Sequence, residues 1–314
     1  MRFGFRLLAL VLLSTIEAFA AERSTAVIES LALAAPTMSG MATVRIVHPT
    51  GRGRFPVVVL SQGALSTAAM YNRLAERWAA RGYVVIQPIP PELAPIGDPR
   101  APAGRRLPGA VDARINYIRF MLGALDQVEA RARALRGKLD RERVAIAGHS
   151  IGALAALLAA GPRLRYAADG GPLPPAEASI DAVVLIGDPS RTGIVPEDAW
   201  RTLEKPVLLA TGTKDEGEAQ AGSQRPQAVF ALADPPAPAA RHELFVRGMD
   251  VCLGGVLCRA PPGSTPDMAA LSAIAEASSA FLDAYLRGDE SAAEWLRRDS
   301  PPDFANGRAK LRLR

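Results

Sequence analysis

The residues best suited to chemistry lie in the segment Gly-His-Ser-Ile-Gly at positions 148–152. A short apolar run precedes this segment and an alanine-rich helical run follows it, which predicts that Ser150 sits on a sharp strand-to-helix turn. Such a turn lifts the serine hydroxyl above a sheet and presses the residues on either side against neighbouring backbone, where a Cβ would clash. We therefore interpret Ser150 as a nucleophile, and Gly148 and Gly152 as residues that the turn requires.

A serine that attacks a carbonyl group needs backbone N–H donors for the negative charge that develops on the oxygen. The helix expected after Ser150 points its free amides toward the reaction centre, so Ile151 N–H is one expected donor. The second donor is expected after an earlier strand, where Ser-Gln-Gly-Ala occupies positions 61–64. Ala64 N–H is our candidate, because Gly63 lets the backbone turn toward the site. The alternative is that Gln62 and Gly63 form only a strand-to-helix turn.

Strand-like and helix-like segments alternate along the chain, which predicts an α/β fold with one doubly wound, mainly parallel sheet. Expected strands lie at residues 26–33, 42–47, 55–60, 83–87, 143–147, 182–186, 207–211 and 243–246. Expected helices lie at residues 68–80, 111–135, 151–160, 268–286 and 292–297. The stretches 88–108, 161–178 and 252–266 are expected to form loops that shape a binding pocket.

The first 20 residues have the features of an export signal: two arginines, an apolar stretch and Ala-Phe-Ala at 18–20. We expect residues 1–20 to be a signal peptide, 21–299 a single domain and 300–314 a tail, in a periplasmic or secreted protein. The alternative is a retained membrane anchor. The apolar stretch is too short to span a bilayer and no longer one follows, so no integral membrane segment is expected after cleavage.

The net charge of +5 comes from basic residues that are scattered along the chain. A cluster occurs only near the C-terminus, which we interpret as a solvated, frayed end, and no nucleic-acid partner is implied; its members are Arg308, Lys310, Arg312 and Arg314. In an oxidising compartment the two cysteines, Cys252 and Cys258, are expected to form a local disulfide, with two unpaired thiols as the alternative. The three histidines lack the spacing of metal ligands, so no metal site is expected.

Several segments together resemble a known group of enzymes. They are Phe-Pro-Val-Val-Val-Leu-Ser-Gln-Gly at 55–63, Trp-Ala-Ala-Arg-Gly-Tyr-Val-Val-Ile-Gln-Pro at 78–88, the elbow segment 139–150 and the segment 280–288. The chain resembles bacterial dienelactone-hydrolase-like proteins of the α/β-hydrolase family, a branch that includes polyester (PET) hydrolases and platelet-activating-factor acetylhydrolases. The resemblance spans residues 45–296. It implies hydrolysis of a small ester or lipid-like substrate by a Ser-His-Asp triad, without a metal or an organic cofactor. The group usually has Ser-His-Gly where this chain has Ser-Gln-Gly, a change that spares the backbone donor.

The resemblance places the acid of the triad after a late strand. Asp215 follows the expected strand 207–211 and is the first choice. Asp188, which ends the preceding strand, is the second. Either aspartate is also suited to capping a turn or a helix start.

The base is missing from its expected position. The group has Gly-x-Asp-His after the last strand, whereas this chain has Gly-Met-Asp-Val at 248–251. Valine has no lone pair, so Val251 cannot accept the proton of the serine. Asp250 and Asp215 would be weak substitutes, because a carboxylate with a pKa near 4 is poorly matched to a serine hydroxyl.

None of the three histidines is expected to replace the missing base. The side chain of His149 should leave the site and pack in the interior. His48 is expected at a surface or turn far from the base position. His242 begins a strand whose other end is about 20 Å away, so we expect it at the surface or at a strand edge.

Two hypotheses of function remain. In the first, the chain is an exported serine ester hydrolase with weak activity or with a base supplied in an unexpected way. In the second, it is a catalytically inactive relative that binds an ester, a lipid or a protein partner. Losing the triad histidine of a serine hydrolase costs about six orders of magnitude in turnover, so the sequence disfavours ordinary triad catalysis.

Overall fold

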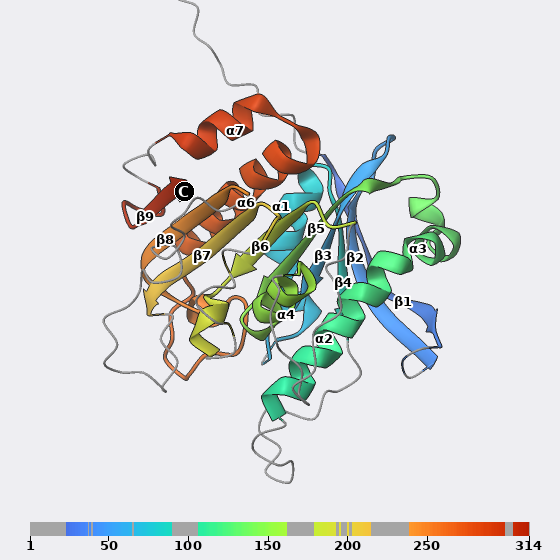
Figure 1. Ribbon diagram of the computed structural model, residues 1–314, viewed down its shortest axis with the longest axis horizontal. Coiled ribbons are helices and arrows are strands. Elements are labelled where there is room, and N and C mark those ends of the chain that lie inside the picture. Colours follow the sequence, from blue (N-terminus) through green and yellow to red (C-terminus); the bar gives the residue numbers. More distant parts are fainter. Residues whose placement is uncertain are drawn as a thin grey trace, which may run out of the picture.

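The computed structural model describes most of the chain between residues 23 and 313 (Figure 1). Residues outside the description are 1–22, 37, 39, 65, 90–105, 162–178, 193–194, 196–199, 201–202, 215–238, 299–303 and 314. The expected signal peptide, most of the expected loops 88–108 and 161–178, and Asp215 therefore lie outside the described residues.

A single sheet of nine strands runs through the molecule in the order β1-β2-β4-β3-β5-β6-β7-β8-β9. The strands are β1 (Thr25–Ala35), β2 (Gly40–Pro49), β3 (Phe55–Ser61), β4 (Val84–Ile89), β5 (Leu139–His149), β6 (Ala182–Ile186), β7 (Val207–Lys214), β8 (Arg241–Asp250) and β9 (Ala309–Leu313). The run from β4 to β8 is parallel, while β1, β2 and β9 are antiparallel to their neighbours. This confirms the predicted α/β fold with a mainly parallel sheet.

Helices cover both faces of the sheet (Figure 1). The α-helices are α1 (Asn72–Ala80), α2 (Arg106–Gly123), α3 (Leu125–Arg131), α4 (Ile151–Ala159), α6 (Met268–Arg287) and α7 (Glu290–Arg297). Short 3-10 turns are η1 (Ala68–Tyr71), η3 (Arg133–Leu135), η4 (Pro189–Thr192) and η7 (Leu253–Gly255). One core contains α2 and α4, and the other contains α1 and α6. The side chains of β3 alternate between the two cores, as expected for a strand covered on both faces. Val57 and Val59 belong to the first core, and Val58 and Leu60 belong to the second.

The region expected as one helix at 111–135 is broken into α2, α3 and η3. Ala124 interrupts it with φ −104° and ψ 10°, directly after Gly123 at the end of α2. The apolar periodicity continues through the break, since Leu125 and Val128 are still buried in the first core. The apolar periodicity of the sequence therefore could not predict the break between α2 and α3.

The C-terminal segment is an edge strand, so the prediction of a solvated, frayed tail is wrong. Strand β9 pairs antiparallel with β8, and Phe304, Ala309 and Leu311 are buried against it. The basic residues Lys310 and Arg312 alternate with the apolar ones, which is the pattern of a strand with one buried face. The prediction of a frayed tail rested on the cluster of positive charge and did not use that alternation.

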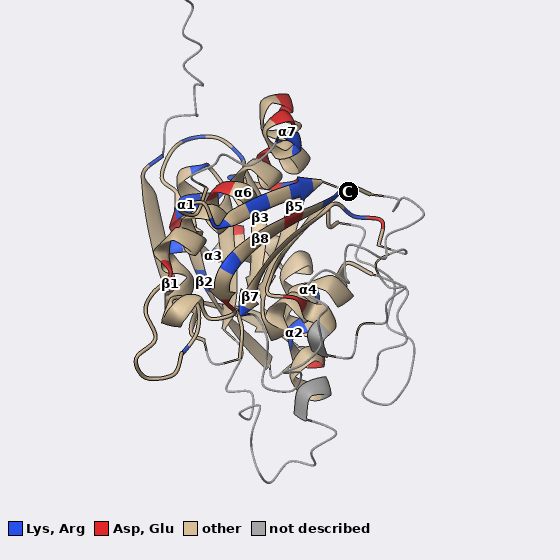
Figure 2. Cartoon of the chain, turned by 90° about the vertical axis from the view of Figure 1, so that its left-hand side faces the viewer, with Lys and Arg blue, Asp and Glu red and all other residues tan. Residues whose placement is uncertain are grey.

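Charged residues of both signs are spread over the helices and the strand ends (Figure 2). Helix α7, for example, carries Glu290, Glu294 and Arg297. Among the described residues, no helix is both long enough and apolar enough to cross a bilayer.

We predict that Leu311→Ala lowers the free energy of unfolding by about 2 kcal/mol, because it truncates a leucine that is buried in the second core, on the strand beside β8. Leu313→Ala is the matched control in the same strand, and since Leu313 is 41% exposed its cost should stay below about 0.5 kcal/mol. Urea unfolding of both variants measures the difference. Equal effects would contradict the docking of β9.

Candidate active site

Ser150 occupies a strained turn between β5 and α4. Its backbone has φ 55° and ψ −121°, which is a left-handed φ for a residue that carries a Cβ. The turn is held by Ser150 N–H, which donates to Ile186 O at 2.9 Å, and by Ser150 O, which accepts from Ala153 and Leu154 in the first turn of α4. The segment therefore has the strand-turn-helix geometry that exposes a nucleophile at the end of a sheet.

The turn has no space for a side chain at Gly148 or Gly152. A Cβ on Gly148 would lie 2.0 Å from Gly152 O, and a Cβ on Gly152 would lie 2.2 Å from Ser61 O. Neither neighbour can move aside, because both are backbone atoms in the middle of the sheet-to-helix junction. The end of β3 is thus in direct backbone contact with the start of α4.

The segment after β3 is fixed by a buried arginine. Arg114 of α2 donates from Nε to Gln62 O at 3.1 Å and from Nη2 to Gly63 O at 3.4 Å. In a trans peptide the carbonyl and the N–H point in opposite directions, so the N–H of Gly63 and of Ala64 face away from the guanidinium. Gly63 N–H is bonded to the Tyr71 hydroxyl at 2.9 Å. This orientation favours Ala64 N–H as the second oxyanion donor.

Sequence reasoning did not single out Arg114. It is buried, and burial lowers the pKa of its guanidinium to about 10, so that it stays protonated at neutral pH. A third bond, to Ala110 O, satisfies the group without a carboxylate. The signal was present in the sequence: Arg114 lies between Val111, Ile115 and Ile118 on the apolar face of its helix.

Val251 directly follows β8, at the place where the resemblance puts the triad histidine. The preceding residue, Asp250, uses its carboxylate to accept from Cys252 N–H at 2.8 Å and from Gly254 N–H at 3.1 Å. Those bonds commit Asp250 to the turn that follows. It therefore holds the loop and is poorly available as a substitute base.

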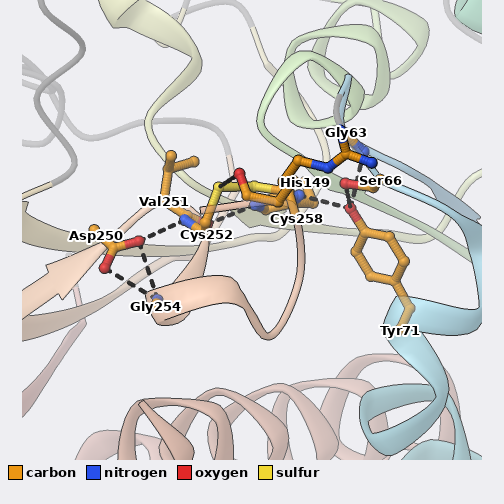
Figure 3. Close-up of a disulfide and its surroundings, with 10 residues drawn as sticks. Gly63, Ser66, Tyr71, His149, Asp250, Val251, Cys252, Gly254 and Cys258 are labelled. Atoms are coloured by element: carbon orange, nitrogen blue, oxygen red, sulfur yellow. Dashed lines mark hydrogen bonds between the residues drawn. A yellow bond between two sulfur atoms is a disulfide. The ribbon is translucent and has the colours of Figure 1, made fainter. Parts of the chain in front are cut away.

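Cys252 and Cys258 are joined by a disulfide with a Cα–Cα distance of 4.8 Å (Figure 3). The bridge closes the turn that begins at Asp250, and Figure 3 shows it beside Val251. Backbone bonds within the turn, from Gly255 and Leu257 to Cys252 O, add to the closure. The backbone of residue 251 is consequently held from its C-terminal side.

His149 is completely buried, and each of its ring nitrogens has a partner (Figure 3). Nε2 lies 2.7 Å from Val251 O, and Nδ1 lies 2.6 Å from the Tyr71 hydroxyl. Burial lowers the pKa of this imidazole to about 4, so it is neutral at pH 7. Because a carbonyl can only accept, the proton sits on Nε2, and Nδ1 accepts from Tyr71. The expectation that His149 packs in the interior agrees with this position. The expectation that its side chain leaves the site is wrong, because the ring contacts Val251 O and Gly63.

The other two histidines lie away from the site and are buried on strands inside the sheet, so the expectations of a surface or turn position for His48 and a surface or strand-edge position for His242 are wrong. His48 is within β2, with Nδ1 2.9 Å from Pro49 O. His242 lies on β8 beneath α6, where Nε2 is 2.9 Å from the Tyr285 hydroxyl and the ring packs edge-on against Phe281. Within the described part of the chain, which includes all three histidines, no imidazole is hydrogen-bonded to Ser150.

Asp188 is the acid candidate that the structure describes. It follows β6 and accepts from the N–H and the hydroxyl of Ser190 at 2.9 and 2.6 Å. These bonds form a turn, the alternative role that the sequence left open. Among the described residues, no group of histidine, cysteine and acidic side chains is arranged to bind a metal ion.

The family model for Chlorophyllase matches residues 15–168, just under half of the chain, from the first strands through the elbow to α4. The strand order of the sheet and the elbow at Ser150 agree with that match. The chain has the α/β-hydrolase fold. No curated protein gives a significant match.

For this α/β-hydrolase fold we predict that Gly152→Ala lowers the melting temperature by about 6 °C or more, on the order of 3 kcal/mol, because the new methyl group overlaps Ser61 O. Gly109→Ala in α2 is the control. A Cβ there would meet nothing within 4 Å, so it should be neutral or slightly stabilising. Differential scanning fluorimetry compares the two, and an equally mild effect would show that the elbow has room for a side chain.

Stability should also depend on pH through the buried histidines. Burial lowers the pKa of His149 and of His242 to about 4, from about 6.5 in the unfolded chain, so only the unfolded state binds these protons at pH 5. We expect full stability above pH 6.5 and a loss approaching about 1.4 kcal/mol per pH unit for each histidine as the pH falls toward 4. Urea unfolding between pH 7.5 and 4.5 measures the slope. His242→Phe should remove about one proton from it, and an unchanged slope would contradict the prediction.

Proposed function

We propose that this α/β-hydrolase is an exported protein that binds a small ester or lipid-like ligand at Ser150 and hydrolyses it at most slowly. The observation that carries the proposal is Val251, a hydrocarbon side chain directly after β8, where the fold would place the general base. Without a proton acceptor, the serine hydroxyl stays a weak nucleophile, and turnover should fall by about six orders of magnitude.

The rest of the site supports the proposed binding of an ester. The elbow keeps its strained conformation at Ser150, and Arg114 orients the segment that carries the expected donor Ala64. Ile151 begins α4 and supplies the other expected donor. A carbonyl group of a bound ester would therefore still find hydrogen-bond donors. Asp215 remains the proposed acid, in the segment that follows β7.

A serine esterase whose base is supplied in an unexpected way is the second candidate, and the geometry at Ser150 favours it. Its φ of 55° and ψ of −121° keep the strained turn that presents a nucleophile. Without such a base, the oxyanion hole and substrate binding alone would give a hydrolysis rate about 10³ to 10⁴ times that of the reaction in water.

The disulfide supports the proposed export. A bridge between Cys252 and Cys258 forms and persists in the periplasm or outside the cell, whereas the cytosol keeps such thiols reduced. The proposed leader at residues 1–20 would deliver the chain to that compartment.

We predict that Val251→His raises the kcat/KM for a short-chain nitrophenyl ester by at least about 100-fold, the usual contribution of a positioned general base. Val251→Ala removes the valine without adding a base and is the matched control. Ester hydrolysis, followed at 405 nm or by pH-stat, measures the gain; in the double variant with Ser150→Ala the gain should disappear.

Labelling by a fluorophosphonate separates the two candidate functions. Under our proposal the wild type labels no faster than Ser150→Ala, while the Val251→His variant labels rapidly. Brisk turnover by the wild type, abolished by Ser150→Ala, would show that a base exists and would overturn the proposal.

A further inference from the structure

One imidazole connects the two loops that flank Ser150. On one side, His149 Nε2 donates to the carbonyl of Val251, at the base position. On the other, Nδ1 accepts from the Tyr71 hydroxyl, which in turn accepts from Gly63 N–H in the oxyanion segment. The ring belongs to the residue before the nucleophile, so it is attached to the elbow itself (Figure 3).

The ring of His149 is closely packed against the oxyanion segment. A Cβ on Gly63 would lie 2.7 Å from His149 Nδ1, so the oxyanion segment is in van der Waals contact with the imidazole. Ser66 Oγ lies 3.0 Å from the Tyr71 hydroxyl and closes the group on its outer side. Tyr71 is itself buried, and burial raises the pKa of its phenol to about 12, so it remains a hydroxyl donor at neutral pH.

We propose that His149 is a positioning residue, which sets the placement of the oxyanion segment 61–66 and of position 251 relative to Ser150. Through its two nitrogens it holds both loops at fixed distances from the elbow. The inference deepens the proposed function, because a base introduced at position 251 would depend on this bond for its placement.

The chemistry of the ring permits variants that break one connection at a time. An asparagine at 149 places an amide oxygen near the position of Nδ1, where it accepts from Tyr71, but its amide is too short to reach Val251 O. A glutamine extends its amide nitrogen toward the position of Nε2 and donates to Val251 O, while the Tyr71 hydroxyl loses its bond to residue 149 and keeps Ser66 Oγ as a partner. A leucine breaks both connections.

Hydrogen exchange followed by mass spectrometry on the disulfide-bonded protein tests the proposal without any need for activity. We expect His149→Asn to speed exchange about tenfold in residues 250–258 only, as expected when one buried hydrogen bond is lost. His149→Gln should do so in residues 61–66 only, and His149→Leu in both. Tyr71→Phe should behave like His149→Gln. Tyr117→Phe is its control, because the Tyr117 hydroxyl has no hydrogen-bond partner among the described residues.

The outcomes distinguish positioning from a general structural role. A merely structural histidine would raise exchange evenly, including in α6, or would leave both loops unchanged; either result overturns the proposal. In the Val251→His background, His149→Asn should reduce kcat at least tenfold with KM within about twofold, and His149→Gln should retain most of the gain at position 251. If Val251→His is inactive but the exchange pattern holds, then the proposed function fails and the positioning role stands.

Discussion

The arrangement of the site depends on one close contact, between the end of β3 and the start of α4. Gly152 lies against Ser61 O so tightly that no Cβ fits, and Gly148 is pressed equally tightly on Gly152 O. This contact fixes the oxyanion segment, which continues β3, beside Ser150, which precedes α4. Because every atom in the contact is backbone, the spacing does not depend on side-chain rotamers.

The loop after β8 is also held tightly by its contacts, although it has a valine at the expected base position. The carboxylate of Asp250 and the disulfide from Cys252 fix the backbone on both sides of Val251, and His149 holds its carbonyl. A loop with so many constraints presents its side chain in a defined direction. Under the proposed function, catalysis is limited by the chemistry of one side chain, since the backbone that would carry an imidazole is in place.

The sequence predicted the elements and the elbow because both are local patterns. Alternating apolar runs placed β1 to β8, and the glycine spacing placed Ser150. What it missed were contacts between residues distant in the chain. The buried roles of His242 and Arg114 depend on packing against α6 and on carbonyls of residues 62 and 63, and no spacing encodes these. Strand β9 was missed for a different reason. The basic residues suggested a solvated end, and the alternation of apolar and basic residues was not used.

The polar group around His149 explains why so much of the site is specified together. In a buried position each unmade hydrogen bond costs about 1–3 kcal/mol, and the imidazole makes two, to Tyr71 and to Val251. Both bonds form only when β8 has docked and η1 has closed over the elbow, so neither loop gains its full stability alone. The phenol adds Gly63 N–H to the same condition. A neutral imidazole, with a donor and an acceptor on opposite sides of one rigid ring, meets this requirement in a way that no single amide side chain does, since an amide of fixed length reaches only one of the two partners.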